Sequence, residues 1–244
     1  MTTPHLSIVI ITLNEEKRLP LLLSDLAAQT WTDFEVIHVD SKSTDRTVDV
    51  SHGLAHSFEH YRVIEMQNRG VSLGRNTGAA VAQGKRLLFL DADTRLGSDF
   101  LRTALGELED EQAAVGIVTM STDGLAIPYK LGFNLFNAGI RLTSVFFPTA
   151  IGACLFSTPQ MHAAIEGFDE SLSLCEDCNY ALKAHRRDRR AVSVLRQQFH
   201  FDPRRLEQDG FATTGLTYLR ANIRRFFSGE LHNQEIPYEF GHYK

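Results

Sequence analysis

The sequence is poor in cysteine, with three in 244 residues. Three cysteines are too few for a disulfide framework, so we expect the chain to work in a reducing compartment. Cys175 and Cys178 have the Cys-x-x-Cys spacing of zinc and redox motifs. The sequence offers neither a second such pair nor a thioredoxin-like context, and we therefore interpret this spacing as a coincidence.

Long hydrophobic runs are also missing. The most apolar region, 125–156, is interrupted by Lys130 and Arg141, so it is not expected to span a bilayer. The first residues lead into a strand-like run and do not resemble a secretory signal. These absences predict a cytoplasmic location, either free or at the inner face of a membrane.

Two glycine-rich signatures are absent as well. The first strand-like run is not followed by Gly-x-Gly-x-x-Gly, and there is no Walker loop. A nucleotide bound by this chain would be held by side chains and a metal, and not by a glycine cradle.

The net charge of −5 hides an asymmetry along the chain. Residues 1–182 carry 13 Lys and Arg against 23 Asp and Glu, whereas residues 183–228 carry 11 against 4. Such a split indicates either an anionic partner for the basic part or a solvated pair of basic helices.

Strand-like and helix-like segments alternate through the first part of the chain, which predicts a parallel, doubly wound α/β sheet. β-Branched and apolar runs predict strands, and periodic apolar residues predict helices. The predicted strands are 6–11, 34–39, 61–65, 86–90, 115–120, 150–156 and 192–199. The predicted helices are 16–29, 47–55, 70–83, 128–144 and 177–185.

Polar residues follow these strands where each one ends. Thr12 and Asn14 follow the first strand, Asp40 ends the second, and Asp91 and Asp93 come directly after the apolar run 87–90. The carboxyl ends of parallel strands gather along one edge, so these side chains are expected to converge on one crevice. Two neighbouring carboxylates repel each other unless a cation such as Mg²⁺ or Mn²⁺ joins them, with phosphate oxygens completing its shell. The alternative is a polar loop that caps the strand.

Several motifs carry a resemblance. They lie in order at 7–15, 39–45, 74–78, 90–93, 167–170 and 175–177. Together they resemble the family 2 glycosyltransferases of the GT-A fold, over roughly residues 6–200. The resemblance implies a mostly parallel nucleotide-binding sheet with helices on both faces. It also implies an enzyme that moves a sugar from a nucleoside-diphosphate donor to an acceptor hydroxyl with inversion.

The resemblance also implies roles for single residues. Asp40 is similar to the acid that pairs with a uracil or related base, Asp91 to a ribose or metal contact, and Arg75 could reach the base or the diphosphate. The residues implied in donor binding are Thr12, Asn14, Glu15, Asp40, Arg75 and Asp91. Lys42 stands where the family usually has glycine.

The metal and the general base are implied in the same way. Asp93 resembles the direct metal ligand, with Asp91 beside it, and His200 is either a further metal or diphosphate contact or a structural residue. Asp177 resembles the base that acts on the acceptor hydroxyl, with Glu176 as the second choice. The alternative for this acidic pair is helix capping, because acids favour the first turn of a helix.

We expect a GT-A catalytic domain at 1–202, with a donor-binding half at 1–95 and an acceptor-binding half at 96–202, and a basic helical extension at 203–244. The expected partners are a nucleotide-sugar donor and a saccharide or lipid-linked acceptor, without nucleic acid. The helix 128–144 is expected to cover the core, or else to line a site for an apolar acceptor. Two other classes stay open, a sugar-phosphate nucleotidyltransferase and a nucleotide-sugar-binding module without catalysis.

The extension contains a helix with one apolar face and arginines off that face. This pattern suits either contact with a membrane surface or docking on the catalytic domain. The apolar residues are Leu216, Leu219, Ile223, Phe226 and Phe227, and the arginines are Arg220, Arg224 and Arg225.

Overall fold

The strand β1 (Leu6–Thr12) lies inside the molecule and is buried along its whole length. Ile8 and Ile10 pack into one hydrophobic core, and Val9 and Ile11 pack into another. Successive strand residues point to opposite faces of a sheet, so an apolar residue at each position indicates helices on both faces. The computed structural model describes residues 3–172, 174–201 and 211–231.

The strands of this described part form an eight-stranded sheet in the order β3-β2-β1-β4-β7-β6-β8-β5. The strands β3, β2, β1 and β4 are parallel, which confirms the predicted doubly wound half. The remaining strands are β2 (Phe34–Asp40), β3 (Tyr61–Glu65), β4 (Arg86–Asp91), β5 (Thr94–Arg95), β6 (Val115–Met120), β7 (Cys154–Ser157) and β8 (Val192–Phe201).

The second half of the sheet is mixed. β7 runs antiparallel to both β4 and β6, and β5 runs antiparallel to β8. The strand predicted at 150–156 was too long at its start, because β7 begins only at Cys154. The backbone of Gly152 and Ala153 bonds to Asp177 and Asp91 instead of continuing a ladder.

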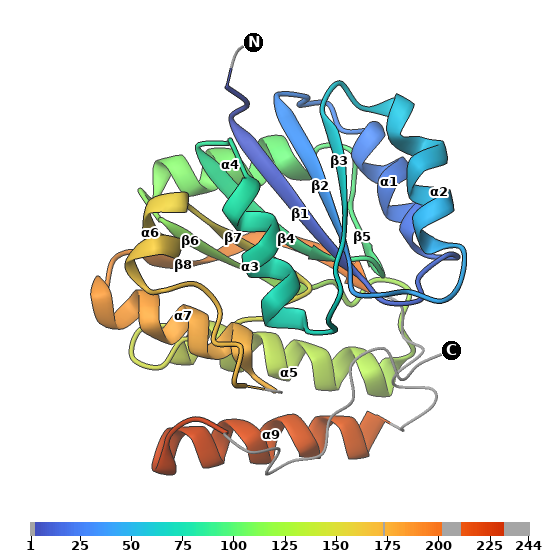
Figure 1. Cartoon of the computed structure of the whole chain (residues 1–244). Coiled ribbons are helices and arrows are strands. Elements are labelled where there is room, and N and C mark those ends of the chain that lie inside the picture. The colour runs from blue at the N-terminus through green and yellow to red at the C-terminus, as the bar shows by residue number, and fades with distance from the viewer. Residues whose placement is uncertain (1–2, 173, 202–210, 232–244) are drawn as a thin grey trace.

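Helices cover both faces of the sheet (Figure 1). One core includes side chains of α1 and α4, and the other includes side chains of α7 and residues that pack from α3. α3 lies very close to β1, since a Cβ added at Gly78 would stand 2.3 Å from Val9 Cγ1. The helices are α1 (Leu19–Ala27), α2 (Thr47–Leu54), α3 (Val71–Val81), α4 (Phe100–Asp110), α5 (Ile127–Thr143), α6 (Pro159–Ala164), α7 (Glu176–Arg187) and α9 (Phe211–Ser228), with a short 3-10 turn at Ala55–Ser57.

The helices α5 and α9 lie along one side of the molecule, below the sheet in Figure 1. α5 buries Phe133, Asn137 and Ile140, so it is a cover helix as predicted. α9 contacts the start of α7 through Ala221, which packs with Cys178. Among the described helices, none is long and apolar enough to cross a membrane.

Candidate functional site

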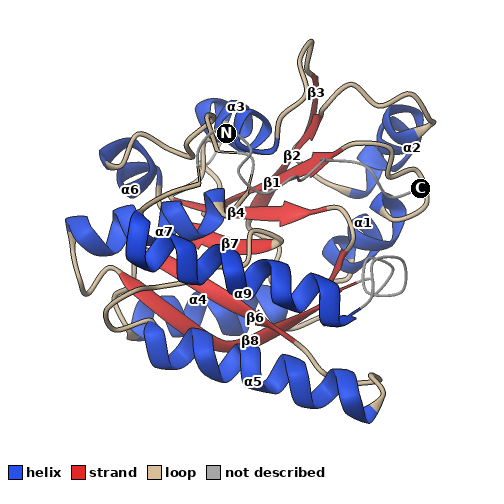
Figure 2. Cartoon of the chain, turned by 90° about the horizontal axis from the view of Figure 1, so that it is seen from below, coloured by secondary structure: helices blue, strands red, loops and turns tan. Residues whose placement is uncertain are grey.

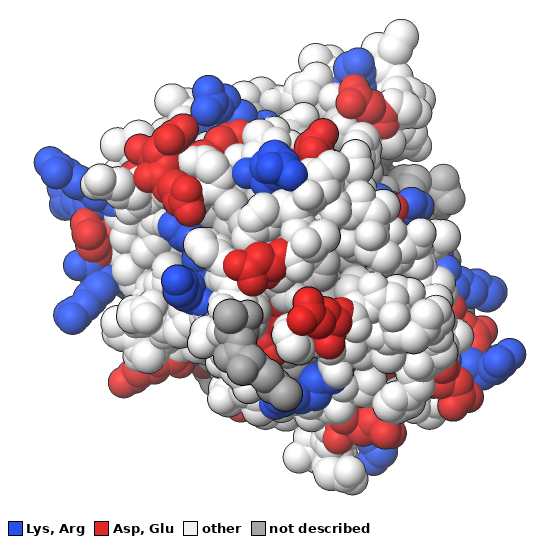
Figure 3. Space-filling model, turned by 90° about the horizontal axis from the view of Figure 1, so that it is seen from above, with Lys and Arg blue, Asp and Glu red and all other residues white. Residues whose placement is uncertain are grey.

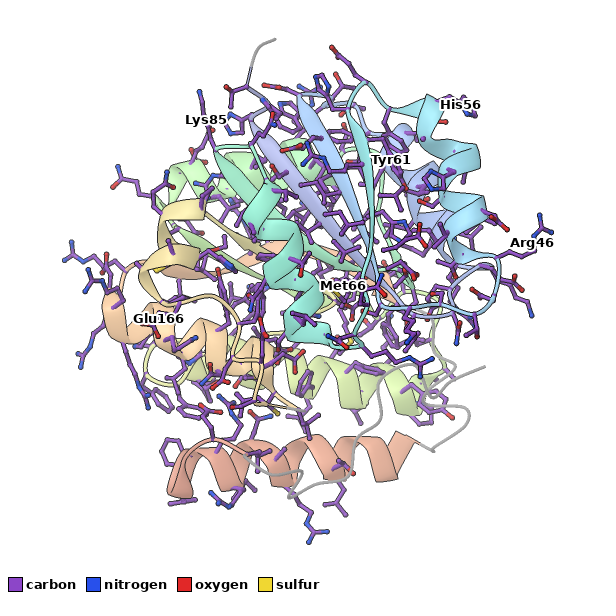
Figure 4. The ribbon with its side chains drawn as sticks, in the orientation of Figure 1. Arg46, His56, Tyr61, Met66, Lys85 and Glu166 are labelled. Atoms are coloured by element: carbon purple, nitrogen blue, oxygen red, sulfur yellow. The ribbon has the colours of Figure 1, made fainter. Side chains whose placement is uncertain are left out.

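The carboxyl ends of β1, β2 and β4 bring three of the predicted site residues to one edge. Thr12 lies opposite Asp40 in the β1–β2 ladder, and Ile11 lies opposite Asp91 in the β1–β4 ladder. In Figure 4, Met66, just past the end of β3, lies on the side of α5, while Lys85, just before β4, lies at the far end. The predicted convergence of these strand ends is therefore confirmed.

Asp40 is held by its own loop. Its Oδ1 accepts hydrogen bonds from the hydroxyls of Thr12 (2.8 Å) and Ser43 (2.5 Å), and its Oδ2 accepts from the backbone N–H of Ser43 (2.8 Å). Lys42, between them, has a φ of 66°, a left-handed conformation that glycine adopts more readily. These bonds fix the orientation of a buried carboxylate at the edge of the sheet.

The loops after β1 and β2 are joined to each other. The side-chain oxygen of Asn14 accepts from the N–H of Thr44 at 2.8 Å, and the N–H of Asn14 donates to Ser43 Oγ at 2.9 Å. The N–H of Glu15 donates to Thr47 Oγ1 at 2.8 Å. Thr12, Asn14, Glu15 and Asp40 thus lie within one hydrogen-bonded pair of loops.

A buried polar chain lies behind Asp40, and the sequence interpretation did not identify it. The hydroxyl of Thr12 lies 2.8 Å from His38 Nε2, and His38 Nδ1 lies 2.6 Å from Ser51 Oγ. Ser51 Oγ in turn lies 2.8 Å from the hydroxyl of Tyr61. The signal in the sequence was a histidine within an otherwise apolar strand, where both faces are expected to be buried.

The direction of this chain follows from its last bond. Because Thr12 donates its only proton to Asp40, its oxygen must accept from the Nε2–H of His38, and Nδ1 then accepts from Ser51. Burial lowers the pKa of His38 to about 4, against the opposing influence of Asp40, so the imidazole is neutral at neutral pH. The chain therefore directs its hydrogen bonds toward the Asp40 carboxylate.

Arg75 joins the two halves of the chain. It lies in α3 with its side chain 2% exposed, donates from Nη2 to Asp91 at 2.9 Å, and donates from Nη1 to Glu176 at 2.8 Å. Its guanidinium also lies over the ring of Phe168, 5.2 Å from the centroid. In this structure Arg75 binds two acids of the protein, and its contact with a donor stays a prediction.

The guanidinium of Arg75 is positively charged at neutral pH. Burial alone would lower the pKa of its guanidinium, but the carboxylates of Asp91 and Glu176, followed by that of Asp177, raise the pKa above its ordinary value. The result is an ionic cluster of one arginine and three acids, drawn from the end of β4, from α3 and from the first turn of α7.

Asp177 lies in this cluster and is half-buried. Its Oδ2 accepts the N–H of Gly152 at 2.6 Å, and its Oδ1 accepts the N–H of Cys178 at 2.6 Å. Burial and then the charge of Glu176 raise the pKa of Asp177 to about 6, although Arg75 and the Cys178 N–H act against this. A carboxylate with a pKa near the working pH suits a general base.

The helix-capping alternative has partial support. The N-cap position of α7 is occupied by Cys175, which has a left-handed φ of 61° and makes no side-chain capping bond. Glu176 and Asp177 occupy the first turn, where acids are favoured by the helix dipole. Cys175 and Cys178 are buried free thiols, and a hydrogen bond with Cys175, then burial, raise the pKa of the Cys178 thiol. Among the described residues, neither lies in a group of three or more His, Cys, Asp or Glu side chains that could hold a metal.

The predicted metal ligands lie on adjoining segments. Asp93 immediately precedes β5, and His200 is paired with Arg95 of β5 in the β5–β8 ladder. The described residues contain no group of three or more His, Cys, Asp or Glu side chains that could hold a metal. Asp91 and Asp93 still offer the hard oxygen ligands of Mg²⁺ or Mn²⁺, which can bind through one or two carboxylates and take phosphate and water oxygens for the rest.

These observations define the class of protein. The sheet has a parallel half with polar residues at its strand ends, and the antiparallel β7 extends it. An acidic pair in the first turn of α7 lies beside this edge. This arrangement is that of a GT-A-type fold. The family model described as "Glycosyl transferase family 2" matches residues 7–153, and the chain belongs to this family.

Relatives agree with this assignment. The chain is 38% identical over 154 residues to a PGL/p-HBAD biosynthesis glycosyltransferase of Mycobacterium tuberculosis, covering 60% of this chain and 60% of the relative. It is 26% identical over 206 residues to the poly(ribitol-phosphate) beta-N-acetylglucosaminyltransferase TarS of Staphylococcus aureus, covering 80% of this chain and 35% of the relative. The chain thus spans less than two thirds of the length of either relative.

Solved structures share the fold. The crystal structure of S. aureus TarS 1–349 in complex with UDP-GlcNAc has a TM-score of 0.66 at 21% identity, covering 80% of this chain and 58% of that one. The mannosyltransferase PcManGT from Pyrobaculum calidifontis, in complex with GDP-Man and Mn²⁺, also has a TM-score of 0.66, at 20% identity, covering 80% and 57%.

Proposed function

We propose that this protein transfers a sugar from a uridine-diphosphate donor to an acceptor hydroxyl with inversion, using a divalent cation. The observation that carries the proposal is the Arg75 cluster. Its guanidinium bonds to Asp91, at the strand-end edge, and to Glu176, whose neighbour Asp177 is a carboxylate with a raised pKa that acts on the same guanidinium through its charge. A donor site and a general base are therefore held in a single ionic unit.

Asp40 gives the preference for uridine. Its carboxylate is oriented by Thr12 and Ser43, and it retains acceptor capacity for a further hydrogen bond from a base N–H. Uracil carries an N–H at the ring nitrogen, whereas cytosine carries an acceptor at the same place. Equal calorimetric affinities for the uridine and cytidine diphosphates would contradict this preference.

Asp91, Asp93 and His200 would hold the cation, and the joined loops of Asn14 and Glu15 would close over the base. When bound, Mg²⁺ or Mn²⁺ supplies Lewis-acid stabilisation of the diphosphate leaving group. Support comes from the hard oxygen ligands on this edge, and from Mn²⁺ in the related mannosyltransferase structure. Arg75 holds Asp91 in place and adds positive charge beneath the same edge.

Asp177 would take the proton of the acceptor hydroxyl. Its two oxygens are oriented by the N–H groups of Gly152 and Cys178, so its remaining lone pairs have fixed directions. Attack by the activated oxygen on the face opposite the diphosphate leads to inversion. Glu176 bonds to Arg75 at 2.8 Å and is therefore better suited to hold the cluster than to accept the proton.

The acceptor is proposed to be a saccharide or lipid-linked molecule. The half at 96–202 would bind this acceptor, and the half at 1–95 would bind the donor. Residues 203–244 would form a separate helical extension. The named relatives are a PGL/p-HBAD biosynthesis glycosyltransferase and a poly(ribitol-phosphate) beta-N-acetylglucosaminyltransferase, and from these names we propose a cell-envelope glycan as the product. The reaction would take place in the cytoplasm or at the inner face of a membrane.

A thermal-shift screen of nucleotide sugars, with and without Mn²⁺, tests the donor, because a ligand that binds only the folded state raises the melting temperature. We expect a UDP-sugar to give the largest rise, and only with the metal. Release of pyrophosphate from a sugar phosphate and UTP would favour a nucleotidyltransferase instead. Hydrolysis of the bound donor would exclude a module that only binds.

A further inference from the structure

The outer side of α5 is apolar and lies in solvent. Leu131 is 71% exposed, Leu135 74% and Leu142 75%, while Phe133 and Ile140 on the inner side are buried. The segment after the helix adds Val145 at 77% and Phe146 at 59%, and Ile127 at the start of the helix is 83% exposed. Isolated exposed apolar residues are ordinary, but a row along one helix indicates an interaction surface.

The helix α9 extends this surface. It docks on α7 through Ala221 and the side chain of Arg225, which is fully buried, bonds to Glu230 at 2.8 Å and lies over the ring of Phe147. Docking on the catalytic domain was one sequence interpretation for this helix. Four residues of its predicted apolar face stay largely exposed, Leu216 at 55%, Ile223 at 50%, Phe226 at 52% and Phe227 at 78%. The contacts are made by Ala221, by Arg225 and by Phe226, whose ring meets that of Phe147.

The two rows lie on the same side of the molecule. Figure 2, seen from below, shows α5 and α9 in front of the sheet, and Figure 1 shows them beneath it. Phe147, just after α5, contacts Phe226 of α9 with ring centroids 5.3 Å apart. We call this surface, formed by the exposed apolar side chains of 127–146 and 216–227, the α5–α9 face.

The two segments that form this face carry charge of one sign. The segments 127–147 and 211–228 contain no Asp or Glu, whereas they contain Lys130, Arg141, Arg220, Arg224 and Arg225. Lys130, Arg141 and Arg220 are exposed. The opposite face of the molecule, shown in Figure 3, carries acidic and basic side chains together.

We propose that the α5–α9 face binds an anionic lipid surface, with the apolar side chains inserted among the headgroups and acyl chains and the basic side chains at the phosphates. A helix surface with exposed Leu and Phe beside Lys and Arg is the pattern of interfacial membrane binding. A second copy of this chain fits less well, because a two-fold contact would place the positive charges of these two segments against each other, and neither segment contains an acid. The inference does not depend on which reaction the site performs.

The test is co-sedimentation of the full chain with lipid vesicles. We expect binding to phosphatidylcholine vesicles that contain about 30% phosphatidylglycerol, and much weaker binding to phosphatidylcholine alone, since basic residues are attracted to anionic lipids. Raising the salt concentration should weaken the binding to the anionic vesicles.

Two variants and a matched control locate the face. Leu131→Glu with Leu135→Glu, and separately Phe227→Glu, should each reduce vesicle binding by about tenfold or more, because each places an acid where apolar surface would insert. Leu21→Glu is the control, because Leu21 is also an exposed apolar residue (46%) but lies in α1. The melting temperature and its rise with donor should be unchanged in all three variants.

Equal vesicle binding by the wild type and the two face variants would overturn the proposal, as would no binding to anionic vesicles. Sedimentation analysis without lipid gives one further outcome. The protein could be a dimer that the face variants dissociate and that does not bind vesicles. This result would assign the α5–α9 face to a second copy of the chain and would also overturn the proposal.

Discussion

The backbone N–H of Gly152 donates a hydrogen bond to Oδ2 of Asp177 at 2.6 Å. This bond joins the loop before β7 to the first turn of α7. It fixes the position of one carboxylate oxygen of Asp177, the proposed base, through the backbone of that loop. Gly152 also faces Arg75, since a Cβ added there would lie 2.6 Å from Nη2. Gly152 therefore lies between the proposed base and the arginine, and it contacts both.

Replacement of Asp177 by Asn should remove the proton acceptor. Because Asn has a single acceptor oxygen, it can accept only one of the two hydrogen bonds from the Gly152 and Cys178 N–H groups. Transfer in the chemical step should fall by roughly 10²–10⁴-fold, the usual range for a general base. Donor affinity should change little, because the residue is proposed to face the acceptor, whereas the melting temperature should fall with the lost hydrogen bond. Near-normal transfer by a folded Asp177→Asn protein would leave Glu176 as the base or dismiss the mechanism.

The pH dependence of transfer provides a separate check. The pKa of Asp177 is raised to about 6, so the carboxylate is the base form above that pH and is lost as the pH falls below it. We expect the transfer rate at low acceptor concentration to rise with pH and level off above about 6. A flat profile between pH 5 and 8, measured at constant ionic strength, would contradict this assignment.

Replacement of Gly152 by Ala should disturb the cluster without altering any of its charges. The new Cβ would stand 2.6 and 3.0 Å from the two terminal nitrogens of Arg75, so either the arginine or the loop must move. A displacement near 1 Å at a catalytic group can cost about 10²-fold in rate. The control is Gly106→Ala in α4, where an added Cβ meets nothing within 4 Å. Equal activity of both variants would show that the loop tolerates the methyl group.

Replacement of Thr12 by Val should weaken donor binding. The change removes the hydroxyl that lies between His38 and Asp40, so the carboxylate loses one of its orienting bonds. A hydrogen bond to a charged group contributes about 1.5–3 kcal/mol, so UDP affinity should fall by about ten- to a hundredfold. Isothermal calorimetry measures this change.

Ser7→Ala is the matched control for Thr12→Val. Ser7 donates to Glu35 at 2.6 Å between the same two strands, β1 and β2, but at their opposite ends. Both variants should lower the melting temperature, whereas only Thr12→Val should lower UDP affinity. Equal UDP affinities of the two variants would show that the polar chain from Tyr61 to Asp40 does not contribute to nucleotide binding.

Removal of the metal should stop transfer. EDTA should abolish activity and added Mn²⁺ should restore it, because the proposed carboxylates need a cation to bind a diphosphate. Asp93→Asn should remove the extra melting-temperature rise that Mn²⁺ gives in the presence of UDP. Asp49→Asn, at an exposed position in α2, should keep it. Full turnover in EDTA would exclude the metal from the reaction.

Most of the parallel half of the fold could be predicted, because β1 and β4 are continuous apolar runs and the helices between the strands are periodic. Boundaries were less accurate. α1 begins at Leu19 and not at 16, with Pro20 in its first turn, a position that proline favours. The antiparallel direction of β7 could not be predicted, since an apolar run has no direction of its own.

The placement of Asp40 and Asp91 at one edge could be predicted because each ends a strand. Glu176 and Asp177 were expected from the family resemblance. The partners of these acids could not be predicted. Arg75 bonds to Glu176 across 101 positions of sequence, and His38 reaches Tyr61 only through Ser51. The first pair is created by the packing of α3 and α7 on the sheet, and the second by the packing of α2 beside β2 and β3. No local sequence pattern contains either. The outward orientation of Phe227 likewise follows from how α9 docks.

Arg75 also limits how such a chain can be recombined. A chimera that joins this donor half to the acceptor half of another protein would keep the pair with Asp91 but could lose Glu176. The buried guanidinium would then lack one of its two anionic partners. Removal of one partner from a buried ion pair destabilises the folded state by about 3–5 kcal/mol. Exchange of acceptor specificity by grafting should therefore succeed only when the graft brings an acid to the start of its own α7, so this one contact restricts which halves can be inherited together.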